Sequence, residues 1–228
     1  MDAAKTWAYL VYWIVLIASC TLAFFNLEPF NDILRMLLMP FLAIYMFLCM
    51  KPTHSDSLKI YFSAALAFSC IGDITRILDS TMGLIAMCIS YSIANIFLAL
   101  SFLKIRPVKI NKAVYANLAI VLGAVVIYFL FFKAVSASKI GHQKAPYIIN
   151  MLSEFIALSF AANIIDSNSR KKLAFNYFLP AIGLSIAASA LYVWNKYMVL
   201  EPRLYAFSLM AYGYSKLLCI DGFRKTSK

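Results

Sequence analysis

The residue of this sequence that points most clearly to chemistry is Asp73, an aspartate within an otherwise apolar stretch. The stretch runs from Leu58 to Leu78, and at ~1.5 Å per residue a helix of this length crosses a bilayer. A carboxylate at such a depth costs at least ~2.5 kcal/mol, so it usually faces a partner or a water-filled cavity. In a low dielectric the group is either a neutral acid or an anion held by a cation and hydrogen bonds. Asp73 is therefore our first candidate catalytic residue.

A second carboxyl and two arginines extend this candidate site. Glu154 lies in another apolar stretch, and if it faces Asp73 the two groups would differ in protonation and supply one acid and one base. Arg35 and Arg76 are suited to a phosphate, which a guanidinium binds through its planar fork. Together these residues predict a site for a phospholipid-like substrate, with the carboxyls at the reacting bond and the arginines at the head group.

Each of these residues also has a simpler interpretation. Asp73 and Arg76 are spaced i, i+3 and would form an ion pair that lets the end of a helix reach water. Glu154 would be interfacial, because it lies only a few residues inside its apolar stretch. Arg35 would extend its side chain to the lipid head groups.

Neutral polar residues and one lysine complete the candidate substrate contacts. Asn95, Asn150 and Ser189 would orient water or substrate, although Asn95 and Ser189 are also typical of interhelical hydrogen bonds. Tyr212 and Lys216 belong to a polar stripe on the last apolar segment, and Lys216 is near enough to its end to reach the cytoplasm instead.

Motifs of other site chemistries are missing from the sequence. It contains no HExxH motif, no Gly-rich phosphate loop and no GxSxG elbow. His54 and His142 lie in connections and are far apart, so they have no metal-ligand spacing. The five cysteines lie in apolar stretches without a CxxC motif and are interpreted as small apolar residues. We therefore expect neither a metal nor another cofactor.

The composition restricts the class of protein. Of the 228 residues, 63% are hydrophobic and 14% are charged, whereas soluble domains average about 25% charged residues. This predicts an all-α polytopic membrane protein, which we expect in the cell (inner) membrane. The net charge of +11 is spread over short connections rather than one patch, so nucleic-acid binding is not expected.

Eight apolar segments can be drawn along the chain, which predicts a bundle of about eight transmembrane helices. The connections are short and polar, so residues 1–228 are expected to form a single domain. The first segment lacks a small-residue cleavage signal and is interpreted as a retained helix. The segments are Thr6–Phe25, Ile33–Met50, Leu58–Leu78, Met82–Phe102, Ala113–Phe132, Pro146–Ile165, Asn176–Trp194 and Arg203–Ile220.

The distribution of lysine and arginine predicts how the bundle is oriented. With eight segments, the side that carries both termini has nearly twice as many of these residues near the helix ends as the other side. The positive-inside rule therefore places both termini in the cytoplasm. This topology brings Asp73, Glu154, Asn150 and Ser189 to the outer half of the bundle.

Four short motifs occur in an order that matches a known family. They are RMLLMPFLAIY at Arg35–Tyr45, FSCIGD at Phe68–Asp73, Asn195–Tyr197 after the seventh segment, and YGYSKLL at Tyr212–Leu218. The first two resemble the Lys-Pro-Leu-x-Met-Pro-x-Leu and Phe-Ser-x-x-Gly-Asp stretches of the YhhN-type lysoplasmalogenase family, and the others are similar to its closing motifs. The likeness covers roughly Asp32 to Gly222.

The resemblance implies an eight-helix membrane hydrolase that cleaves the vinyl ether bond of a lysoplasmalogen, a lysophospholipid. The products would be a fatty aldehyde and a glycerophospho-head group. In that chemistry an acid protonates the vinyl ether carbon, and water adds to the resulting oxocarbenium-like centre. Two membrane-embedded aspartates are thought to act in the family, and the first of them matches Asp73.

The chain departs from the family pattern at several of these positions. The second aspartate falls on Ser189, an expected glutamine on Lys216, an early lysine on Arg35, and an expected histidine on Tyr91 or nearby. The loss of one of two carboxyls would lower the rate by orders of magnitude if both transfer protons. Either Glu154 supplies the missing group, or the chain has drifted from the family's reaction.

Three functions are consistent with these residues. The leading hypothesis is a lysoplasmalogenase-like ether hydrolase, with Asp73 as acid/base and Glu154 as its partner. The second is a non-catalytic lipid-binding or sensing relative, which the serine at position 189 favours. The third is a small proton-coupled transporter, since intramembrane Asp, Glu and Lys also mark ion paths, although no inverted repeat is evident. The oligomeric state is not predicted.

Overall fold

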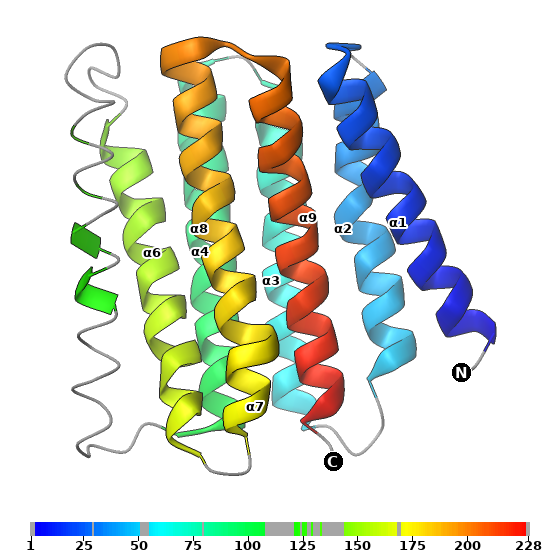
Figure 1. Cartoon of the computed structure of the whole chain (residues 1–228), viewed down its shortest axis with the longest axis vertical. Coiled ribbons are helices and arrows are strands. Elements are labelled where there is room, and N and C mark those ends of the chain that lie inside the picture. Colours follow the sequence, from blue (N-terminus) through cyan, green and yellow to red (C-terminus); the bar gives the residue numbers. More distant parts are fainter. Residues whose placement is uncertain are drawn as a thin grey trace.

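Helices make up every element in the described part of the chain (Figure 1). The computed structural model describes residues 3–28, 30–50, 55–78, 80–107, 144–167 and 170–226, and a few positions between 121 and 133. The α-helices are α1 (Ala3–Phe24), α2 (Phe30–Cys49), α3 (Asp56–Thr75), α4 (Thr81–Ile105), α6 (Lys144–Asn163), α7 (Lys171–Leu173), α8 (Leu179–Trp194) and α9 (Pro202–Lys225). A 3₁₀ turn at Ile164–Asp166 and π-helical turns at Ala174–Phe178 and Asn195–Val199 adjoin them.

Each predicted apolar segment except the fifth corresponds to one of these helices, with boundaries that differ by a few residues. The largest difference concerns the seventh, because the helical stretch there is continuous from Lys171 to Val199. The fifth segment, Ala113–Phe132, lies outside the described residues apart from a few positions. The total of eight spans therefore stays a prediction.

Within the described residues, six helical stretches are long and apolar enough to cross a membrane. They are Ala3–Phe24, Phe30–Cys49, Asp56–Thr75, Thr81–Ile105, Ala145–Asn163 and Lys171–Val199. Large apolar side chains such as Ile14, Phe47 and Ile60 are exposed on the outside of the bundle, whereas charged side chains such as Asp73 and Glu154 are buried inside it. This distribution is the reverse of that in a soluble protein and is typical of an integral membrane protein.

Helix α9 is as long as the spanning helices but more polar. It packs against α1, α2 and α8, and Figure 1 shows it within the bundle between α8 and α2. Its buried residues include Ser208, Tyr212, Ser215 and Lys216. Polar side chains are tolerated on this helix because most of its surface contacts other helices rather than lipid. α9 therefore supplies polar groups to the interior.

The direction of the helices follows from contacts at their ends. Asn163 Nδ2, at the end of α6, donates a hydrogen bond of 3.3 Å to the carbonyl of Arg106, just after α4. α4 and α6 therefore run in the same direction, and the end of α4 and the start of α6 lie at opposite ends of the bundle. Both described chain ends lie at one end of the bundle, opposite the connection between α8 and α9 (Figure 1). Which side of a membrane they occupy stays a prediction.

A proline in α2 shapes the contact between α2 and α3. Pro40 lies inside the helix and has no backbone N–H, so the carbonyl of Met36 lacks its usual helical donor. The Cys70 thiol on α3 donates to that carbonyl, with Sγ and O 3.9 Å apart. The contact holds the two helices together close to Arg35 on α2 and Asp73 on α3.

Candidate functional site

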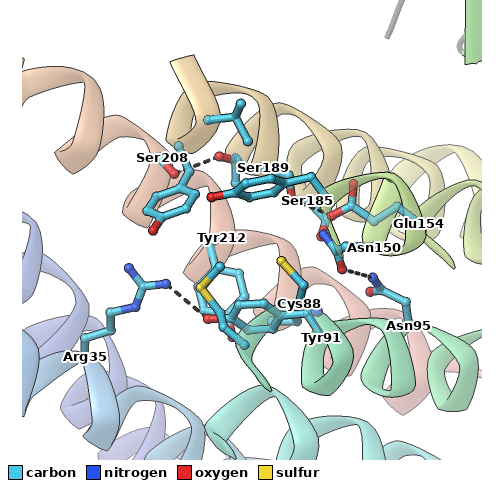
Figure 2. A pocket seen from close by; sticks show the side chains of 16 residues that line it. Arg35, Cys88, Tyr91, Asn95, Asn150, Glu154, Ser185, Ser189, Ser208 and Tyr212 are labelled. Atoms are coloured by element: carbon cyan, nitrogen blue, oxygen red, sulfur yellow. Dashed lines mark hydrogen bonds between the residues drawn. The ribbon is translucent and has the colours of Figure 1, made fainter. Parts of the chain in front are cut away.

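A polar cavity of about 60 Å³ lies between α2, α4, α6, α8 and α9. At ~10–15 Å³ for each molecule it has room for about four waters. Figure 2 shows Arg35 on one side of this central cavity and Glu154 on the other. Its lining consists of Arg35, Met87, Cys88, Tyr91, Asn95, Tyr147, Asn150, Glu154, Ser185, Ala188, Ser189, Tyr192, Val193, Ser208, Tyr212 and Lys216.

Asp73 lies behind one wall of the cavity and accepts hydrogen bonds from three helices. Its Oδ1 accepts from Arg35 Nε at 2.8 Å and from the Tyr91 hydroxyl at 2.7 Å. Its Oδ2 accepts from the Tyr212 hydroxyl at 3.1 Å. The carboxyl is buried and does not line the cavity, whereas all three of its donors do. The Asp73 carboxyl is thus held by a salt bridge and by two hydroxyl donors.

Arg35 is fully engaged inside the bundle. Besides its salt bridge to Asp73, its Nη1 donates to the Tyr205 hydroxyl at 2.8 Å and its Nη2 to the Tyr91 hydroxyl at 3.2 Å. The side chain is buried, so it does not extend to the lipid head groups. Its role in this structure is to neutralise Asp73 and to position the surrounding tyrosines.

The glycine before Asp73 makes this arrangement sterically feasible. A Cβ atom at Gly72 would lie 2.7 Å from Tyr91 Cε1 and 2.9 Å from two further atoms of that ring. The Tyr91 ring therefore rests on the backbone of α3, where its hydroxyl reaches the next residue. The Gly-Asp pair in the sequence is explained by this close approach.

Glu154 lies on the opposite wall and is less completely satisfied. The Ser189 hydroxyl on α8 donates to its Oε1, while its buried Oε2 accepts no hydrogen bond from the described residues. Glu154 is buried near the middle of α6, so it is not interfacial in this structure. A carboxyl with one unused oxygen thus lines a cavity that can hold water.

Amides next to Glu154 hold α6 against α4. Asn95 Nδ2 donates to Ser153 Oγ at 3.1 Å and to Asn150 Oδ1 at 3.4 Å. Ser153 Oγ in turn donates to the carbonyl of Asn150 at 2.6 Å. Asn95 and Asn150 therefore join the helices as well as lining the cavity.

Lys216 brings an amine into the same cavity. Its side chain is buried, and it forms no salt bridge with the described residues. Its Nζ lies 5.6 Å from the centre of the Tyr212 ring. It also interacts electrostatically with Glu154 and Asp73. The cavity therefore contains a carboxyl and an amine without a direct ion pair between them.

Arg76 lies in a separate polar vestibule of about 400 Å³, at the end of the bundle that carries the α8–α9 connection. Its guanidinium carbon lies 4.4 Å from the ring centre of Tyr205 and 5.0 Å from that of Tyr192. Among the described residues it forms no salt bridge with Asp73. The vestibule is lined by Asn26, Glu28, Asp32, Arg76, Ile77, Tyr192, Asn195, Lys196, Leu200, Pro202 and Tyr205.

Most of the residues expected from the sequence thus converge. The cavity contains Arg35, Asn95, Asn150, Glu154, Ser189, Tyr212 and Lys216, whereas Asp73 lies behind its wall and Arg76 in the vestibule. No hydrogen bond joins the carboxyls of Asp73 and Glu154 within the described residues. Sequence reasoning did not identify the role of Tyr205, Tyr192 or Lys196. Tyr91 could have been identified from the sequence by its spacing, because it lies four residues before Asn95 and therefore on the same face of the helix.

Comparisons with family models, with curated proteins and with solved structures find no significant match to this chain. Within the described residues, no group of three or more His, Cys, Asp or Glu side chains could hold a metal ion. The geometry of the cavity is therefore the basis for any functional proposal.

The substitution Gly72→Ala tests the close approach of Tyr91. The added methyl group should displace the ring from Asp73 and lower the free energy of unfolding by about 1–3 kcal/mol. Thermal unfolding in detergent measures the effect. Gly183→Ala in α8 is the matched control, because nothing lies within 4 Å of a Cβ there. Equal stability of the two variants would show that Tyr91 does not need the glycine.

The buried pair of Arg35 and Asp73 should be essential for stability. Arg35→Met leaves an uncompensated buried carboxylate, which costs about 3–5 kcal/mol. The double variant Arg35→Met with Asp73→Asn removes that charge and should recover part of the loss. Melting temperatures of the two variants and the wild type measure this. An Arg35→Met protein as stable as the wild type would contradict the ion pair.

Proposed function

We propose that the protein is a membrane-embedded hydrolase that cleaves the vinyl ether bond of a lysophospholipid, with Glu154 as its acid. The observation that carries this proposal is the buried Glu154 carboxyl, one oxygen of which accepts no hydrogen bond from the described residues, on the wall of a cavity with room for water. A buried carboxyl without a salt bridge favours the neutral acid form, which is the form that donates a proton.

The proposed reaction uses one carboxyl twice. The protonated Glu154 donates its proton to the vinyl carbon that carries the alkyl chain, and the positive charge develops on the carbon bonded to the ether oxygen. The Glu154 carboxylate then takes a proton from a cavity water as that water adds to the cation. The resulting hemiacetal collapses to a fatty aldehyde and the free hydroxyl of the glycerophospho-head group. One water is consumed and no cofactor is needed.

The resemblance to the YhhN-type lysoplasmalogenase family supports this assignment through position 189. The family's second aspartate falls on Ser189, whose hydroxyl donates to Glu154 Oε1. In the family pattern, position 189 on α8 carries a carboxyl. In this chain the Glu154 carboxyl on α6 lies against that same position. Asp73, which the sequence favoured as the acid, serves in this proposal as a fixed counter-charge for Arg35.

The vestibule is the place at which we propose that the phosphate of the substrate binds. Arg76 and Lys196 both line it, and Arg35 is occupied by Asp73 and the tyrosines. Tyr192 lines the vestibule and the cavity alike, so the two spaces adjoin. In our proposal Arg76 and Lys196 bind the phosphate while the vinyl ether lies beyond Tyr192, beside Glu154.

A non-catalytic lipid-binding protein is the second candidate. The saturated hydrogen bonds of Asp73 and the small volume of the cavity favour it, because about 60 Å³ holds a few waters rather than a lipid. Such a protein would bind the head group in the vestibule and leave the lipid unchanged.

Aldehyde release from a purified sample tests the proposal directly. With a lysoplasmalogen as substrate, Glu154→Gln should lower kcat by at least about 100-fold, the usual contribution of a general acid or base. Glu201→Gln is the matched control, because Glu201 lies outside the cavity. Both variants should melt at the wild-type temperature. If the lipid stabilises the wild-type protein but no aldehyde is released, the hydrolase proposal is wrong and the lipid-binding function takes its place.

The substitution Arg76→Gln tests the head-group site. Removal of one cation from the phosphate should raise KM by about tenfold and leave kcat nearly unchanged, because ground state and transition state lose the same contact. Arg203→Gln, outside the vestibule, is the control. A fall in kcat with an unchanged KM would place Arg76 in the chemistry instead.

A further inference from the structure

Lys216 is the only lysine among the described residues that is buried. It projects from the centre of the chain's most polar long helix into the cavity, and the hydrolysis proposed above gives it no task. A lysine at such a depth is costly unless it is paired or functional. Its presence in the cavity therefore calls for a chemical explanation.

The groups around Lys216 do not form a direct ion pair with it. Glu154 on α6 and Asp73 on α3 interact with it electrostatically, and Tyr212 and Cys219 flank it on α9. Asp73 is already neutralised by Arg35 at 2.8 Å. Glu154 is the proposed neutral acid. With neither carboxyl as a salt-bridge partner, burial favours the uncharged amine, which is a nucleophile.

We propose that Lys216 is a carbonyl-binding site that condenses with an aldehyde to form an imine. The inference rests on the proposed function in one respect, since a fatty aldehyde is the product class of that reaction. The Lys216 nitrogen adds to the aldehyde carbon, and one of its protons passes to the aldehyde oxygen to give a carbinolamine. Glu154 protonates the carbinolamine hydroxyl, which leaves as water while the C=N bond forms, and the remaining N–H proton then returns to the Glu154 carboxylate. One water is released, and no oxidant or reductant takes part.

The lining of the cavity suits this reaction. The acid and the amine face one space, as a carbinolamine dehydration requires. Met87, Ala188 and Val193 give the remaining wall an apolar surface for the first carbons of an alkyl chain. A volume of about 60 Å³ accommodates a short aldehyde, so we expect propanal to react more readily than a long-chain aldehyde added from solution.

Reductive trapping with propanal and cyanoborohydride tests the proposal on the full-length protein in detergent. The reductant converts the imine to a stable propyl-amine, which peptide mass spectrometry locates. We expect Lys216 to be labelled at least about tenfold faster than the half-buried Lys59 and the surface-exposed Lys225, and to saturate with propanal concentration. Lys216→Met should lose this fast label and retain the wild-type melting temperature. Labelling of Lys216 no faster than of Lys59 would overturn the proposal.

A further variant separates this proposal from a purely electrostatic role, and the use of added propanal separates it from the hydrolase. Lys216→Arg places a positive charge at this position but has no amine that can form the imine, so it should abolish the fast label. Fast labelling at the wild-type level in this variant would contradict the site. Added propanal bypasses ether cleavage, so the label does not depend on hydrolase activity. Labelling without aldehyde release from a lysoplasmalogen would refute the hydrolase alone, and release without labelling would refute the imine site alone.

Discussion

The salt bridge between Arg35 and Asp73 is the interaction on which the interior of this bundle depends. Inside a membrane protein an ion pair is stable only when hydrogen bonds satisfy the lone pairs and protons that water would otherwise serve. Here Asp73 receives donors from α2, α4 and α9, and Arg35 reaches two further hydroxyl contacts. Because these donors come from separate helices, the pair fixes their relative positions. Two residues allow the helices to pack closely around this pair. Gly72 admits the Tyr91 ring, and Pro40 leaves a carbonyl of α2 free for the contact between α2 and α3.

This pairing also determines which groups are available for chemistry. Once Arg35 neutralises Asp73, the carboxyl and the amine left in the cavity lining are those of Glu154 and Lys216, which form no salt bridge with each other. A salt bridge would strongly stabilise the charged forms of Glu154 and Lys216, but the structure has no salt bridge between them. Groups that are buried, adjacent and unpaired are those whose protonation can change during a reaction. The stable pair therefore organises the helices, and the unpaired groups carry the proposed reactivity.

The sequence predicted the helices well because hydrocarbon-length apolar stretches are set by bilayer thickness, and it predicted that Asp73 would need a partner. It could not select that partner. Arg76 is closer in sequence, but α3 ends at Thr75, and the side chain of Arg76 lies between Tyr192 and Tyr205 instead. The roles of Tyr192 and Tyr205 were missed for a related reason, because an aromatic residue in a membrane segment has the same sequence pattern whether it faces lipid, a head group or a buried carboxylate. These three environments are distinguished only by how helices that are far apart in the sequence pack together.

Tyr205 links the vestibule to the interior through its hydroxyl, which accepts hydrogen bonds from both Arg35 and Arg76. Two cations on one phenol oxygen repel each other, and Asp73 offsets only the first of them. Arg76 has no carboxylate salt bridge among the described residues, although Asp32 and Glu28 line the same vestibule. An anionic phosphate beside Arg76 would supply the missing counter-charge. It would also draw Arg76 away from the rings of Tyr205 and of Tyr192, the residue that lines both the vestibule and the cavity. In the proposed function, head-group binding and access to Glu154 would thereby be coupled through one arginine.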